Sequence, residues 1–161
     1  MQIEMSIKGL MVDPITNMPI IILRDKEGQK VLPIWVGIFE ANAIALQIEK
    51  IATPRPMTHD LLKSVVTNMS ARVEKVVITD LKDNTFYALI FLSHDGKVLP
   101  IDSRPSDAIA LALRTESPIF VNSDVIEKAK STDLSKDAGE SERIRKWLEN
   151  LDPEEMGKYE M

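Results

Sequence analysis

The pattern of apolar and polar residues predicts strands at the start of the chain and helices after them. Ile3, Met5 and Ile7 alternate with polar residues, which is the period of a half-buried strand, and short apolar runs follow. Alanines and large aliphatic residues then recur without a glycine or proline, which is typical of a buried helix. The expected elements of this half are strands over 3–12, 19–23 and 31–36 and helices over 39–51 and 58–69, the last capped by Thr58.

The second half follows the same plan and ends in a different composition. Its expected elements are strands over 73–81, 86–92, 98–101 and 118–121, a helix from Pro105 to about Arg114, and a short helix over 124–130 capped by Ser123. Beyond Lys130 the chain is rich in Ser, Asp, Lys and Gly, which predicts a linker. A last amphipathic helix, which docks either on the domain or on a partner, is expected from Ile144, Trp147, Leu148 and Leu151.

Two short blocks of sequence occur twice, and they predict an internal duplication. Val31-Leu32-Pro33-Ile34 recurs as Val98-Leu99-Pro100-Ile101, and Ala43-Ile44-Ala45-Leu46 recurs as Ala108-Ile109-Ala110-Leu111. Two copies are too few for a solenoid. We therefore expect an α+β domain over residues 1–130, built from units of about 1–69 and 70–130. The units share one core of mixed or antiparallel sheets with packed helices, and residues 131–161 add the linker and the amphipathic helix.

Composition excludes several classes of protein. The chain has no cysteine, so it has no disulfides, no thiolate metal sites and no cysteine nucleophile. No apolar run approaches the roughly 20 residues that span a bilayer, and the N-terminus does not resemble a signal peptide. We therefore expect a cytoplasmic protein without membrane contact. The formal net charge of −5 offers no overall basic surface, so binding of nucleic acid would depend on a local cluster of basic residues.

Charged residues gather where the strand over 98–101 ends and the next helix begins. Asp102, Arg104 and Asp107 occupy this junction, a common place for binding groups. In the first copy Trp35, Gly37 and Asn42 take the places of Asp102, Arg104 and Asp107. On one interpretation, the helix N-terminus and Arg104 bind a phosphate or carboxylate. On the other, Asp107 satisfies amides of the first helical turn and Asp102 pairs with Arg104 to fix the loop.

His59 is a stronger candidate for chemistry than His94, which lies at the tip of a turn. Imidazole titrates close to neutral pH, so a histidine beside Asp60 and near Arg55 can serve as a general base. The alternative is that Thr58 and Asp60 cap the helix and His59 has no role. Glu40 either points into the same cleft or belongs to the first turn of its own helix.

Three motifs follow one another in order along residues 1–130. They are Leu32-Pro33-Ile34-Trp35-Val36-Gly37 with Glu40-Ala41, Pro54-Arg55-Pro56-Met57-Thr58-His59-Asp60-Leu61-Leu62, and Ile101-Asp102-Ser103-Arg104-Pro105-Ser106-Asp107-Ala108-Ile109-Ala110-Leu111-Ala112. Together they resemble the bifunctional nuclease domain family, a bacterial domain long catalogued as one of unknown function and also found in plants. The resemblance implies a compact α+β domain with internal duplication and an activity against RNA and single-stranded DNA.

Carried over by motif position, the resemblance points to a nuclease that hydrolyses phosphodiester bonds. The expected residues are His59, Asp60, Asp102 and Asp107 in catalysis, Arg55 and Arg104 in substrate binding, and Glu40 with Asp102 as ligands of Mg²⁺ or Mn²⁺. The alternative is a non-catalytic binding or regulatory domain in which the Asp/Arg motif is structural. The expected partners are RNA or single-stranded DNA and further copies of this chain, with a dimer as the first expectation.

Overall fold

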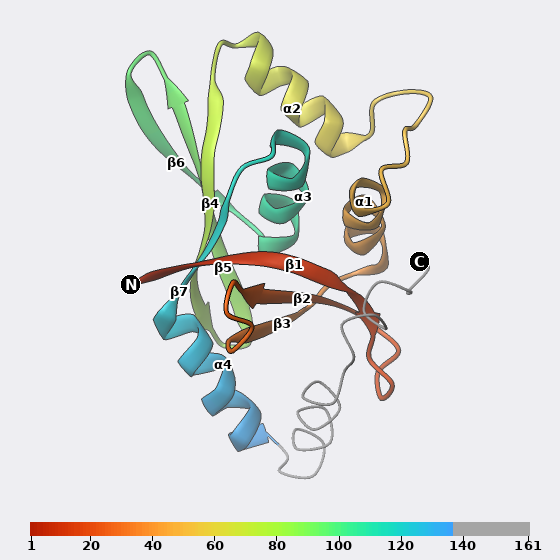
Figure 1. Ribbon diagram of the computed structural model, residues 1–161, viewed down its shortest axis with the longest axis vertical. Coiled ribbons are helices and arrows are strands. Elements are labelled where there is room, and N and C mark those ends of the chain that lie inside the picture. The colour runs from red at the N-terminus through yellow and green to blue at the C-terminus, as the bar shows by residue number, and fades with distance from the viewer. Residues whose placement is uncertain (137–161) are drawn as a thin grey trace.

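The computed structural model describes the backbone of residues 1–136 and the side chains of residues 1–130. The strands are β1 (Gln2–Val12), β2 (Pro19–Asp25), β3 (Val31–Trp35), β4 (Arg72–Lys82), β5 (Thr85–His94), β6 (Lys97–Ser103) and β7 (Ile119–Asn122). The helices are α1 (Ile38–Ile48), α2 (Thr58–Asn68), α3 (Pro105–Thr115) and α4 (Ser123–Lys136). All seven strands belong to one sheet, in the order β3-β2-β1-β7-β4-β5-β6 (Figure 1). The α+β class expected from the sequence is confirmed.

The sheet joins two antiparallel groups of three strands through β7. β1, β2 and β3 pair antiparallel, as do β4, β5 and β6. β7 pairs antiparallel with β1, where Gln2 lies opposite Asn122, and parallel with β4, where Val76 lies opposite Ile119. Each group of three strands is followed by a helix, α1 or α3. The sheet is therefore mixed, and the two units begin with the same order of elements.

Helices α1 and α3 pack against each other and against the sheet, and they supply much of the core. Ile44 of α1 and Ile109 of α3 are fully buried, together with Val76 and Ile78 of β4. Burying one such side chain contributes about 1.5–3 kcal/mol. In Figure 1, α1, α2 and α3 gather above β1, β2 and β3, while α4 lies below them. This arrangement brings the N-terminal ends of α1 and α3 close to the start of α2.

Several element boundaries differ from the sequence prediction. α1 ends at Ile48 rather than residue 51, and Lys50 just after it has a positive φ of 56°. Thr58 and Ser123 are the first residues of their helices, so neither is the cap that we expected. At α2 Asp60 takes over this function, because its Oδ2 accepts the backbone N–H of Met57 at 3.0 Å.

The last described helix is longer than the sequence predicted, and one further predicted helix is not described. α4 continues to Lys136, beyond Lys130, where we expected the helix to stop. The predicted amphipathic helix of residues 144–151 lies outside the described residues. No helix within residues 1–136 combines the length and the apolar character that crossing a membrane requires.

Candidate functional site

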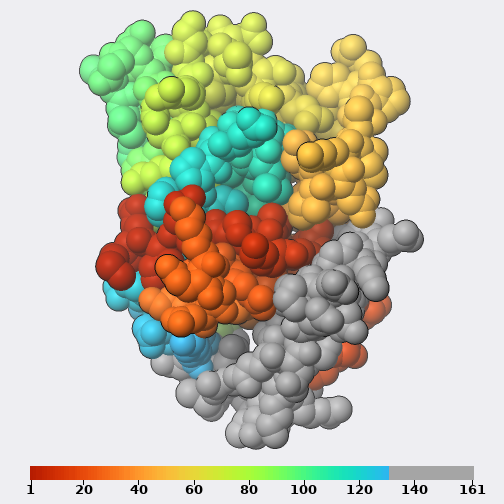
Figure 2. Space-filling model, in the orientation of Figure 1, coloured from red at the N-terminus to blue at the C-terminus, as the bar shows by residue number. Residues whose placement is uncertain are grey.

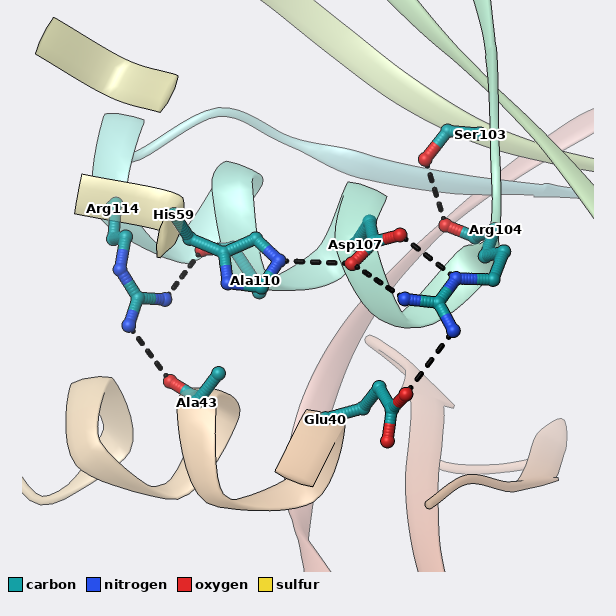
Figure 3. Close-up of polar contacts among 8 residues, drawn as sticks. All are labelled: Glu40, Ala43, His59, Ser103, Arg104, Asp107, Ala110 and Arg114. Carbon is teal, nitrogen blue, oxygen red and sulfur yellow. Dashed lines mark hydrogen bonds and ion pairs between the residues drawn. The ribbon is translucent and has the colours of Figure 1, made fainter. Parts of the chain in front are cut away.

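Arg104 stands at the centre of a polar cluster between the first turns of α1 and α3. It is the N-cap residue of α3, with extended backbone at φ −72° and ψ 147°, and Pro105 follows in the first turn, where its missing N–H is not needed. Its Nε and Nη2 donate to the carboxylate of Asp107 at 2.9 and 3.2 Å, and its Nη1 donates to Glu40 Oε1 at 3.1 Å (Figure 3). The hydrogen bonds that Arg104 donates to Asp107 and then to Glu40 raise the pKa of Arg104. The side chain is nevertheless 63% exposed, so the guanidinium faces solvent.

His59 approaches the same carboxylate from α2. Its Nε2 lies 2.9 Å from Asp107 Oδ1, and its side chain is only 12% exposed. An ionised carboxylate can only accept, so Nε2 carries the hydrogen and Nδ1 of the neutral ring holds the free lone pair. Burial alone would raise the pKa of Asp107, but hydrogen bonds from Arg104 and His59 outweigh it and lower the pKa. Asp107 thus stays ionised and holds both an arginine and a histidine.

Arg114 fixes the three helices around this pair. It is 4% exposed and donates to Asp60 Oδ1 of α2 at 2.8 Å. It also donates to the carbonyl of Ala43 in α1 and to the carbonyl of Ala110 in α3, each at 2.9 Å (Figure 3). The amide of Met57 and then Arg114 lower the pKa of Asp60, against an opposing effect of burial. Because Asp60 is the neighbour of His59, Arg114 also holds His59 in place.

The sequence analysis missed this role of Arg114. The available signal is its spacing, since Arg114 follows Asp107 by seven residues in an otherwise apolar helix, and two helical turns return a side chain to the same face.

The first turn of α1 contributes its acid in the same way as the first turn of α3. Glu40 and Asp107 are each the third residue of their helix, after the N-cap residues Gly37 and Arg104. A Cβ at position 37 would collide with the carboxylate of Glu40, so glycine leaves room for that side chain. By position in the helix, the counterpart of Asp107 is therefore Glu40, and our assignment of Asn42 was wrong. The repeated Ala-Ile-Ala-Leu block misled that alignment because the segments before it differ in length by two residues.

The structure unites some of the predicted site residues and separates others. Glu40, His59, Arg104 and Asp107 are joined by direct hydrogen bonds, and Asp60 lies beside them through Arg114. Asp102, on β6, is exposed and lies opposite Leu89 of β5, and its side chain makes no hydrogen bond or ion pair within the described residues. Arg55 lies in the exposed loop before α2.

Two structural roles considered from the sequence are corrected. Asp102 does not pair with Arg104, because the arginine turns across to α1 and α3 instead. Asp107 does not cap α3, because both of its oxygens are engaged by Arg104 and His59, and α3 has no side-chain cap. The cluster is not enclosed away from solvent, because the side chain of Arg104 is 63% exposed.

The predicted metal ligands do not form a set of donors. Within the side chains that the structure describes, no group of three or more His, Asp or Glu residues is placed to hold a metal ion. Glu40 and Asp107 direct oxygens at Arg104, which is itself a cation, and Asp102 lies exposed on β6 outside their cluster of hydrogen bonds. Mg²⁺ requires oxygen ligands that face the ion, so these residues do not fit a site built on Glu40 and Asp102.

Comparison with known proteins places this site in a family. The bifunctional nuclease domain matches residues 21–133. An uncharacterized protein of Mycobacterium tuberculosis (strain CDC 1551 / Oshkosh) is 36% identical over 155 residues, which cover 92% of this chain and 93% of that protein. Bifunctional nuclease 1 of Arabidopsis thaliana is 32% identical over 108 residues, 65% of this chain and 33% of that protein. Bifunctional nuclease 1 of Oryza sativa subsp. japonica is 30% identical over 106 residues, 63% of this chain and 32% of that protein.

The matches differ in how much of each relative they cover. This chain spans nearly all of the mycobacterial protein but only about a third of each plant protein. The matched region of the family contains Glu40, His59, Arg104, Asp107 and Arg114. The chain belongs to the bifunctional nuclease domain family.

Proposed function

We propose that this chain hydrolyses phosphodiester bonds of RNA and single-stranded DNA, with His59 as general base and Arg104 as the phosphate-binding cation. The observation that carries the proposal is the pairing of His59 with Asp107 next to an exposed, doubly anchored arginine. A histidine oriented by a carboxylate is the arrangement that general-base catalysis uses. The names of the plant relatives agree with this class of reaction.

In the proposed reaction, Nδ1 of His59 takes a proton from the attacking water. The charge of Asp107 stabilises the imidazolium that results, and the hydrogen bond from Nε2 to Asp107 holds the ring in the required tautomer. The water oxygen attacks the phosphorus as it loses that proton, and the bond to the leaving oxygen breaks. The leaving oxygen takes a proton from solvent, and the imidazolium returns its proton to solvent. No step uses a 2′-hydroxyl, so the same chemistry serves RNA and DNA.

Arg104 has donors left for the phosphate. A guanidinium carries five N–H groups, of which three are used on Asp107 and Glu40, so two remain for substrate oxygens. Glu40 and Asp107 fix its orientation in advance, which reduces the entropy lost when the phosphate binds. Arg55 supplies a second cation at the start of α2, and Asp60 supports the site indirectly through Met57 and Arg114.

The alternative, a non-catalytic binding or regulatory domain, is tested by the same assay. Labelled single-stranded RNA and DNA are incubated with the wild-type chain, with His59→Ala, and with His94→Ala as a matched control at the turn. We expect cleavage by the wild type and by His94→Ala and a loss of at least about 10²-fold in His59→Ala. Circular dichroism checks that each variant is folded. No cleavage by the wild type, or equal cleavage by all three proteins, would replace the nuclease proposal with the binding domain.

A further inference from the structure

A pocket of about 310 Å³ opens between α1, the loop after it and α2. Leu46, Ile51 and Pro54 give it apolar walls, while Gln47, Arg55 and Ser64 give it polar groups. In Figure 2, α3 is visible in teal between the yellow-green of α2 and the orange-yellow of α1 and its following loop. Arg114 of α3 belongs to the lining of the pocket, as does Asp60 of α2.

Two polar side chains of this pocket, those of Gln47 and Arg55, are free to meet a ligand. The Gln47 side chain makes no hydrogen bond to another side chain or backbone group within the described residues, so its amide offers both donors and an acceptor. Arg55 is exposed and has no ion pair there either, while its carbonyl accepts the hydroxyl of Thr53 at 2.8 Å and so steadies the loop. Arg114 is neutralised by Asp60. Arg55 thus leaves the pocket with an excess positive charge.

The pocket adjoins the proposed catalytic pair. Asp60 lines the pocket and follows His59 directly in the first turn of α2. On α3, Arg114 and Asp107 are seven residues apart, which at 1.5 Å per residue is about 10 Å along the helix. Figure 3 shows Arg114 on one side of His59 and Asp107 on the other. The pocket is therefore within reach of a nucleotide that adjoins a phosphate bound at Arg104.

We propose that the pocket binds one nucleotide of the substrate strand. Its phosphate lies on Arg55, its base lies against the apolar wall, and Gln47 hydrogen-bonds the edge of the base. Bidentate hydrogen bonds from glutamine amides are a known means of reading base edges. A base that is stacked and paired in a duplex cannot enter a pocket without leaving the helix, so occupation requires a single strand. This inference rests on the proposed nuclease function for its substrate, but its test does not depend on cleavage.

The experiment measures binding of the four ribonucleoside 5′-monophosphates to the full chain by ¹H–¹⁵N NMR titration in EDTA. We expect saturable shifts in residues 46–56 and in the first turns of α2. Gln47→Leu and Arg55→Gln each weaken binding about tenfold or more. Gln47→Leu removes a hydrogen bond to the base, and Arg55→Gln removes a charge-assisted hydrogen bond to the phosphate. Gln29→Leu, a matched change in the exposed turn before β3, leaves binding unchanged.

The outcomes separate the pocket from the catalytic proposal. Absence of saturable shifts, equal binding by all variants, or shifts that map elsewhere would overturn the pocket, even where His59-dependent cleavage persists. Pocket binding without any cleavage would support a nucleotide site and overturn the nuclease. If both hold, Gln47→Leu changes the relative KM for homopolymers of different bases and leaves kcat nearly unchanged, which a merely structural role would not produce.

Discussion

β3 and β6 form the two edges of the sheet, carry the same Val-Leu-Pro-Ile sequence, and differ in what covers them. On β3, Leu32 is 0% and Ile34 is 2% exposed, whereas on β6 Leu99 is 44% and Ile101 is 43% exposed. Each strand has a proline in its middle, a residue that lacks an N–H and is tolerated at a sheet edge. β3 belongs to the main core and contacts α4, but β6 lies outside that core. The same four-residue sequence is therefore buried at one edge and exposed at the other because its neighbours differ.

Helices α1 and α3, which follow these two strands, begin alike but contribute different residues to the site. Gly37 and Arg104 are the N-cap residues, and Glu40 and Asp107 are the acids one turn later. Both acids bind Arg104, so the first half of the chain supplies an acid and the second half supplies an acid and the cation. His59 comes from α2, in the first half. The site therefore depends on both halves, because neither half alone holds the acid, the cation and the histidine.

The largest effect on cleavage is expected for Asp107 in the first turn of α3, compared with Asn42 on α1. Asp107→Asn removes the charge that stabilises protonated His59 and should lower cleavage of single-stranded RNA about 10²–10⁴-fold. Asn42→Ala, at the position that the sequence repeat aligned with Asp107, should leave the rate unchanged, since Asn42 is exposed on α1. Single-turnover rates with the two variants measure this difference. Equal rates would show that His59 does not work through Asp107.

A leucine-to-alanine substitution should lower the free energy of unfolding by different amounts on β3 and on β6. Leu32→Ala should lower the free energy of unfolding by about 2–5 kcal/mol, because it leaves a cavity in the core. Leu99→Ala should cost about 0.5 kcal/mol or less, because the side chain is largely exposed. Urea denaturation measures both values. A large loss in Leu99→Ala that depends on protein concentration would mean that a second copy covers β6, the homo-oligomer predicted from the sequence.

Replacing Arg104 at the start of α3 should reduce activity, but by less than Asp107→Asn does. Arg104→Gln removes charge-assisted hydrogen bonds to the phosphate and should lower kcat/KM by about 10- to 100-fold, equivalent to about 1.5–3 kcal/mol. Arg72→Gln, an exposed arginine paired with Glu74 on β4, is the control. Should Arg104→Gln cleave as fast as that control, Arg104 would hold the helices together and would not bind substrate.

The smallest effect concerns one acid in each half of the sheet, Asp13 just after β1 and Asp80 in β4. Asp13 is 1% exposed and accepts hydrogen bonds from Trp35 Nε1, the backbone of Ile15 and the hydroxyl of Thr16, each at 2.8 Å. Burial alone would raise its pKa, but these hydrogen bonds lower it below the ordinary 3.8. The stabilisation is therefore complete above about pH 5 and is lost as the pH falls through the lowered pKa.

Asp13→Asn should reduce stability by about 1 kcal/mol at pH 7 and flatten the acid dependence of unfolding. Asp80, which binds Lys128 near the surface, should give a smaller change when replaced by asparagine. Unfolding curves between pH 3 and 7 compare the two variants. A steeper acid loss in Asp13→Asn than in the wild type would contradict the direction of the Asp13 shift.

The sequence predicted the strands, the main helices and most of the clustered residues, because periodicity and motif position depend on neighbours along the chain. It could not show that His59 meets Asp107, since 48 residues separate them and the contact depends on how Arg114 anchors α2. It could not show that β6 stays exposed, because the strand itself resembles β3. Asp102 looked equal to Asp107 in the motif, and only its place on the strand side of the junction separates it from the cluster.

The central claim is that the site works through His59, Asp107 and Arg104 and does not depend on a metal held by Glu40 and Asp102. The most direct test measures cleavage of single-stranded RNA by the wild type and by Asp102→Asn, each in EDTA and in Mg²⁺ or Mn²⁺. We predict that EDTA leaves wild-type cleavage intact and that Asp102→Asn stays within a few-fold of it. Cleavage that requires the metal and disappears in a folded Asp102→Asn variant would contradict this account and favour the metal site expected from the sequence.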